Sequence, residues 1–231
     1  MTLALLSFLP LGAGVMSEEK LIEVAGQVRA LAPIGSVVEV RALDRTLVEM
    51  SFPEGSDTPE IILDASRLPP PIGSAVVVLS FDDNLDGGYA RAWQTAQALH
   101  ERFNATATGL FDKRLHCDQV REGAGPQVLA MGMTRRHRDL DRDQYMHYYL
   151  AQHVPLANEL KPPLVLRYRT FRNLQAIGDF QFDCVTFQEF ASQQTLEEFF
   201  GARLADGDNA RDDAAEFIDR LVYNVGQGNW Y

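Results

Sequence analysis

The spacing of apolar positions along the chain changes between two patterns, and each pattern predicts one kind of element. Short apolar runs predict buried strands, whereas apolar side chains that recur every three or four residues predict helices. Ser17 is a good helix N-cap, because its side chain can accept a hydrogen bond from the first turn. In the first half we expect strands at 3–9, 36–43, 74–81 and 106–111, an added hairpin at 46–52 and 60–66, and helices from 17 and over 89–103.

The second half repeats the same order of elements. Asp141 is followed three residues later by Gln144, the spacing of a capping box, and we expect a helix to begin there. Another helix is expected near Thr195. The predicted strands are 127–134, 164–171, 180–190 and 222–227, and a further helical piece is predicted at 214–221.

Each half therefore has the order β-α-β-β-α-β of a ferredoxin-like unit, which predicts an α+β protein. A ferredoxin-like sheet carries helices on one face and leaves the other face in need of cover. Two such units fused in tandem, at 1–115 with the extra hairpin and at 125–231, can pack their sheets face to face as an intrachain α/β barrel. Strand 180–190 supports this, because Phe182 and Cys184 point one way and Val185 and Phe187 the other, so that both faces are apolar. Two unrelated small domains are the alternative.

Composition narrows the class of partner. The chain has 231 residues, 32 acidic against 21 basic, and its net charge of −11 argues against binding to nucleic acid. No apolar run approaches the roughly 20 residues that a membrane-spanning helix needs. Cys117 and Cys184 are too few for a disulfide framework, so we expect a cytoplasmic protein. The segment LALLSFLPL has the character of a signal sequence but lacks a preceding positive region, and a first strand is favoured.

The stretch YMHYYLAQHVPLANEL, residues 145–160, holds the main candidates for chemistry. Tyr145, Tyr149 and His153 share one face of the predicted helix. Pro155 has no N–H group and predicts a kink directly after them. One interpretation is a buried imidazole that acts as a general acid or base beside phenol donors. The other is a core histidine with no chemical role.

From Met133 onward the chain resembles the EthD family of the dimeric α/β-barrel superfamily. The element that carries most of the resemblance is His153-Val154-Pro155-Leu156. The first half is similar in layout only and has Arg29 where the second has His153, so the resemblance implies one family-type pocket in a pseudo-dimeric monomer or a homodimer. The matching segments are TRRHRDLDRDQYMHYYLAQHVPLANEL, LRYRTFRN, DCVTFQEFAS and AAEFIDR.

Two positions depart from the family pattern. The usual tryptophan four residues before the histidine is Tyr149, and a frequent glutamate of the third strand is Phe187. An acid/base scheme that needs this glutamate therefore does not carry over. The resemblance implies His153, Tyr149 and Tyr145 as catalytic residues. It implies a substrate pocket with Tyr168, Arg167, Cys184 and Phe187.

No metal or cofactor is expected. His116, Cys117 and Asp118 are adjacent in sequence, and three adjacent side chains cannot all face one ion without a special loop. The resemblance implies a cofactor-independent enzyme of the isomerase, cyclase, dehydratase or lyase type. Such an enzyme would act by proton transfer on a small hydrophobic carbonyl, lactone or aromatic substrate. The alternatives are a non-catalytic binding protein for small hydrophobic ligands and a haem protein, since some relatives carry haem on a histidine.

Overall fold

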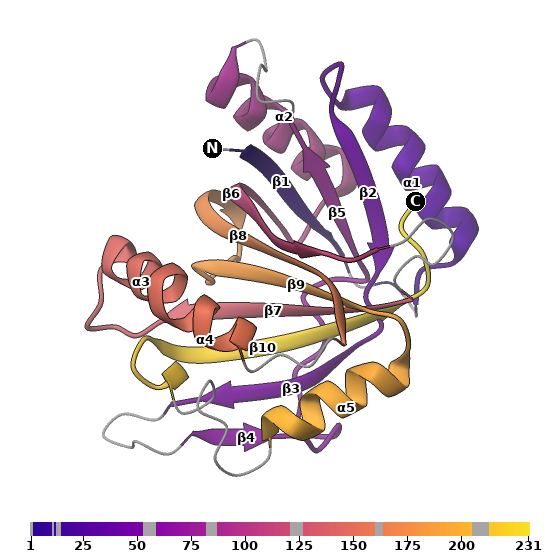
Figure 1. The fold of residues 1–231 in the computed structure, drawn as a ribbon. Coiled ribbons are helices and arrows are strands. Elements are labelled where there is room, and N and C mark those ends of the chain that lie inside the picture. The colour runs from indigo at the N-terminus through magenta and orange to yellow at the C-terminus, as the bar shows by residue number, and fades with distance from the viewer. Residues whose placement is uncertain are drawn as a thin grey trace.

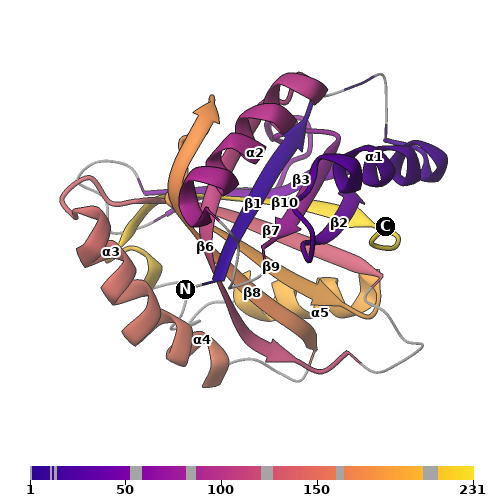
Figure 2. The same cartoon turned by 90° about the horizontal axis from the view of Figure 1, so that it is seen from above.

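One antiparallel sheet of ten strands organises the molecule, in the order β2-β5-β1-β6-β8-β9-β7-β10-β3-β4. In this computed structural model the sheet curls on itself, and helices cover its outer face (Figures 1 and 2). The structure describes residues 2–10, 12, 15–52, 59–81, 87–120, 127–159, 164–204 and 213–231.

The first half follows the predicted order closely. Ser17 caps the first helix as expected, with its side chain accepting from the backbone N–H of Lys20. The predicted hairpin is present, although its turn residues 53–57 lie outside the described residues. The elements are β1 Thr2–Leu9, α1 Glu18–Leu31, β2 Val37–Ala42, β3 Arg45–Ser51, β4 Glu60–Ile62, β5 Ala75–Ser80, α2 Gly88–Phe103 and β6 Ala107–Asp118.

In the second half the capping box at Asp141 and Gln144 is confirmed, with both reciprocal hydrogen bonds formed. The helical piece predicted at 214–221 is wrong from Ile218 onward, and only residues 213–217 form helical turns. Its apolar residues have a spacing that a helix also shows, but from Ile218 the chain hydrogen-bonds to β7 and β3 on either side. The elements are β7 Val128–Arg136, α3 Arg142–Tyr148, a π-helical turn η1 Tyr149–His153, α4 Val154–Glu159, β8 Val165–Gly178, β9 Cys184–Phe190, α5 Gln193–Leu204 and β10 Ile218–Gln227.

The two halves are joined edge to edge, so they share one sheet where two separate sheets were expected. Strand β6 of the first half pairs with β8 of the second, and β3 pairs with β10. The short link between β2 and β3 crosses from one end of the sheet to the other, and Asp44 donates its N–H to the carbonyl of Val225. This crossing draws the ends of the curled sheet together.

Three apolar clusters fill the layers. One lies under α1 and α2 and includes Leu21 and Leu99, and a second lies under α3, η1 and α5 and includes Tyr145 and Leu196. The third lies on the inner face of the curl and draws on both halves, with Phe8 and Phe111 from one and Phe187 from the other. The apolar inner face therefore unites the halves. No helix among the described residues is long and apolar enough to cross a membrane.

Candidate functional site

A π-helical turn places the histidine singled out from the sequence. Over 149–153 the helix widens, and the N–H of Val154 donates to the carbonyl of Tyr149, five residues back. Pro155 follows at once, and its missing N–H removes the bond that would hold a regular α-helix in this turn. The predicted disturbance at the proline is thus an extra residue in the turn. Single π-turns of this kind are frequent at functional sites.

His153 is paired with a carboxylate from a distant segment. Its Nδ1 lies 2.8 Å from Oδ2 of Asp213, and the hydroxyl of Tyr148 donates to Oδ1 of the same carboxylate at 2.7 Å. Burial alone would raise the pKa of Asp213, but hydrogen bonds from His153 and Tyr148 outweigh it and lower that pKa. The carboxylate therefore stays ionised and fixes the ring of His153. Nε2 of His153 makes no hydrogen bond within the described residues, so it is the ring atom available to a substrate.

Two tyrosines stand beside this pair. The phenol oxygens of Tyr149 and Tyr168 are 3.1 Å apart, and both side chains are buried. The ring of Tyr149 lies 5.4 Å from the imidazole of His153, centroid to centroid. Burial raises the pKa of Tyr149 well above its ordinary value, and the neighbouring Tyr168 adds to that shift. Tyr149 therefore stays protonated and can donate a hydrogen bond.

Tyr145 lies deeper in the same layer. Its hydroxyl is 2.5 Å from Oγ1 of Thr134, and burial raises its pKa strongly. Its ring packs on Tyr149 at 5.9 Å and on Phe217 at 5.8 Å. With its hydroxyl engaged by Thr134 and no exposed surface, Tyr145 supports Tyr149 from behind.

The structure divides the predicted site residues between the two faces of the sheet. Tyr168 and Cys184 lie on the helix-covered face together with His153. Phe187 belongs to the inner cluster, and Arg167 pairs with Asp118 and approaches Glu189, which belongs to the inner side. The two groups are separated by the thickness of the sheet and cannot line one pocket.

Several neighbours of His153 were not identified from the sequence. Phe217 packs on the imidazole at 4.9 Å, and Asp213 and Tyr148 bind each other as described. His116 reaches the cluster from β6, with Nε2 at 2.9 Å from Oγ1 of Thr170. A signal for Asp213 was present, because it directly precedes the segment AAEFIDR that carries part of the family resemblance.

No group of three or more metal-ligating side chains occurs in the part of the chain that the structure describes. His153 and Asp213 are a pair, and His116 is already bonded through Nε2. The described residues can offer proton transfer and hydrogen bonding here.

Residues 137–221 match the EthD domain. This match confirms the resemblance seen in the second half and includes His153, Tyr168 and Asp213. The EthD-matching segment begins at the end of β7 and ends within β10. A search of curated proteins found no match.

Solved structures that share the fold match nearly the whole chain. An anthrone oxidase-like protein has a TM-score of 0.53 at 10% identity, covering 100% of this chain and 92% of its own. A DypB variant from Rhodococcus jostii RHA1, in complex with haem, has a TM-score of 0.51 at 12% identity and covers 98% of this chain and 93% of its own. At these identities the likeness shows the α+β fold with its curled antiparallel sheet.

Proposed function

We propose that the protein is a cofactor-independent enzyme that transfers a proton on a small hydrophobic carbonyl, lactone or aromatic substrate. The observation that carries the proposal is the Asp213–His153 pair, which leaves Nε2 as the free position of an oriented imidazole. A general base needs such an orientation as well as a pKa near the working pH. The buried, protonated phenols beside it supply the complementary donors.

In this scheme Nε2 of His153 takes a proton from the carbon next to the carbonyl. The electron pair of the broken C–H bond forms a double bond to the carbonyl carbon, and the π pair of the carbonyl moves to its oxygen, which gives an enolate. Tyr149 or Tyr168 donates a hydrogen bond to that oxygen, where a preorganised donor stabilises developing charge most. Return of the proton to a different carbon gives an isomer. Loss of a leaving group gives a lyase product.

The test is exchange of substrate C–H protons in D2O, followed by NMR over a panel of small aromatic ketones and lactones. Removing a general base typically lowers the rate by about 10²–10⁴-fold. We therefore expect His153→Gln to lower kcat by at least about 100-fold for any compound that exchanges. His147→Gln is the matched control, since His147 is exposed on the same helix. Equal exchange by the parent and His153→Gln would refute the role of His153.

The architecture proposed for this enzyme is a tandem fusion of two ferredoxin-like units. Within the first half the strands lie in the order β2-β5-β1-β6, and within the second half in the corresponding order β8-β9-β7-β10. This supports a pseudo-dimeric chain. The proposal gives that chain one site and, because its two cysteines are free, a cytoplasmic location. A sedimentation experiment that compares the mass in solution with 25.8 kDa tests whether the chain also forms a homodimer.

A binding protein for small hydrophobic ligands is the second candidate, favoured by the buried aromatic rings around His153. A ligand that binds the parent and His153→Gln equally, with no exchange in either, would support it.

A haem protein is the third candidate. The donor set fits, because a ligating imidazole commonly donates its other N–H to a carboxylate, as Nδ1 of His153 can to Asp213. His153 would hold the haem iron, and a Soret band after addition of haemin, lost in His153→Gln, would support it.

A further inference from the structure

A cavity lies at one end of the curled sheet, and His153 is not among its lining residues. Its volume is about 440 Å³, which falls within the range of small-molecule sites, roughly 300–1,000 Å³. The end of β7, the start of β10 and the segment 179–183 between β8 and β9 form its walls. Neither His153 nor the tyrosines around it line this cavity.

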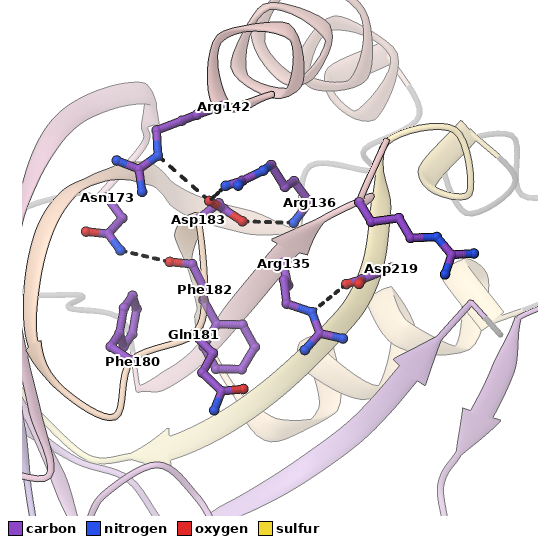
Figure 3. A pocket seen from close by; sticks show the side chains of 10 residues that line it. Arg135, Arg136, Arg142, Asn173, Phe180, Gln181, Phe182, Asp183 and Asp219 are labelled. Atoms are coloured by element: carbon purple, nitrogen blue, oxygen red, sulfur yellow. Dashed lines mark hydrogen bonds and ion pairs between the residues drawn. The ribbon is translucent and has the colours of Figure 1, made fainter. Parts of the chain in front are cut away.

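Arginines dominate its polar wall. Nε of Arg135 donates to Oδ1 of Asp219 at 2.8 Å, and Arg136 forms an ion pair with Asp183. Nε of Arg142 lies 3.9 Å from the same Asp183. Figure 3 shows Arg136 and Arg142 converging on Asp183, with Arg135 beside Asp219. With Arg138, four arginines and two carboxylates line the cavity, so this wall is positive in a chain whose net charge is −11.

The arginines are held in place but keep donors for a ligand. The carboxylates fix Nε of Arg135 and one terminal nitrogen of Arg136. Within the described residues, the terminal nitrogens of Arg135 and Nη2 of Arg136 make no hydrogen bond. A guanidinium that is already oriented binds a carboxylate through two parallel bonds at a lower entropic cost.

The opposite wall is aromatic. The rings of Phe180 and Phe182 meet edge to face at 5.7 Å, and both line the cavity (Figure 3). Phe180 is stacked on Phe8 of β1 at 5.6 Å, and the guanidinium carbon of Arg220 lies 5.9 Å from the ring of Phe182. The two rings are thus supported from behind and can pack against a planar apolar body.

We propose that this arginine pocket, defined by Arg135, Arg136 and Arg142, binds a small aromatic carboxylate. The carboxylate lies against the arginines and the ring packs on Phe180 and Phe182. The excess of positive charge in the lining favours an anion. The inference is independent of the proton-transfer function, because no residue of the Asp213–His153 pair takes part.

The test is calorimetric titration of the full-length protein with 2-naphthoate, with 2-naphthamide as its neutral counterpart and inorganic phosphate as an anion without a ring. We expect 2-naphthoate to bind at least ten-fold more tightly than either, and its affinity to fall as salt is raised. Arg135→Gln removes a donor, and Gln181→Glu places a negative charge on an exposed residue of the wall. Each is expected to weaken 2-naphthoate binding at least ten-fold.

Arg67→Gln is the matched control, because it removes an exposed arginine that pairs with Glu60 and does not line the cavity. It should bind as the parent does, and so should His153→Gln. Should Arg135→Gln not fold, Gln181→Glu carries the test alone. Equal affinity for the amide, tighter binding of phosphate than of 2-naphthoate, or unchanged affinity in both pocket variants would each overturn the proposal.

Discussion

Tyr148 and His153 share one carboxylate, each on a different oxygen of Asp213. Both bonds favour the ionised carboxylate and together lower its pKa against the effect of burial. A carboxyl whose pKa is lowered in the folded state adds stability above its unfolded pKa of about 3.9. That contribution disappears as the pH falls through the lower, folded value.

The first prediction follows from the lowered pKa of Asp213 in the folded state. Asp213→Asn should lower the free energy of unfolding near pH 7 by about 1.5–3 kcal/mol, the range for hydrogen bonds to a charged group. The difference from the parent should shrink below about pH 4. Urea denaturation at pH 7, 5 and 3 measures it. Asp139→Asn, which alters a carboxylate that is 79% exposed, is the control and should show little difference. A deficit in Asp213→Asn that is the same at all three pH values contradicts the prediction.

The sequence predicted where His153 lies better than it predicted its partner, Asp213. Helical spacing placed Tyr145, Tyr149 and His153 on one face, and the structure has them in one layer. Asp213 ends a polar stretch, and polarity alone cannot tell a carboxylate that pairs 60 positions away from one in solvent. Such a contact depends on how β10 returns to β7, which no local pattern encodes.

The ends of the strands were also harder to predict than their positions. The predicted ends of 106–111 and 164–171 are too short, because β6 continues to Asp118 and β8 to Gly178. The extension of β6 pairs with the predicted part of β8, and the extension of β8 pairs with the predicted part of β6. Residues in these extensions, such as Arg114 and Arg172, carry polar side chains that break the apolar alternation. Hydrogen bonding between two long strands extends each beyond its apolar run. Apolar pattern therefore predicted where the strands lie but not how far they continue.

The second prediction concerns the phenol pair. Tyr149 and Tyr168 are both buried with their oxygens 3.1 Å apart, so each depends on the other as a partner. Tyr149→Phe and Tyr168→Phe should each destabilise the fold, and the double variant should cost less than their sum by about 0.5–1.5 kcal/mol. Urea denaturation of all four proteins measures this coupling. Tyr89→Phe, which removes an exposed phenol bonded to Gln175, should be additive with Tyr149→Phe. Strict additivity of the buried pair would refute the bond.

The third prediction concerns the thiols. Cys184 is fully buried, and burial raises the pKa of its thiol to about 12, so almost no thiolate forms at pH 8. Cys117 is only half-buried. In the native Cys117→Ser variant, a thiol reagent at pH 8 should label Cys184 only as fast as the protein unfolds. In urea, which unfolds the protein, the labelling should become fast. Cys184→Ala is the control and should keep the labelling rate of Cys117. Fast native labelling of Cys117→Ser would show that Cys184 is open to ligands.

The fourth prediction contrasts two arginines that approach the same tryptophan. The guanidinium carbons of Arg41 and Arg169 lie 5.4 and 5.2 Å from the ring centroid of Trp230. Arg169 also donates to Glu39 and Glu189, each at 2.6 Å. Arg41 is fully buried, and none of its guanidinium nitrogens has a hydrogen-bond partner in the described part of the chain. Burial lowers the pKa of Arg41 to about 10.

An unpaired buried charge costs several kcal/mol, more than the roughly 2 kcal/mol that a desolvated cation–π contact returns. Arg41→Met should therefore raise the free energy of unfolding by about 1–4 kcal/mol. Arg169→Met should lower it by about 3–5 kcal/mol, because Glu39 loses its cation and Glu189 loses the nearer of its two. Urea denaturation, followed by tryptophan fluorescence, compares the two variants. A loss of stability in Arg41→Met similar to that in Arg169→Met would mean that Arg41 is paired in solution, and the contrast between the two arginines would fail.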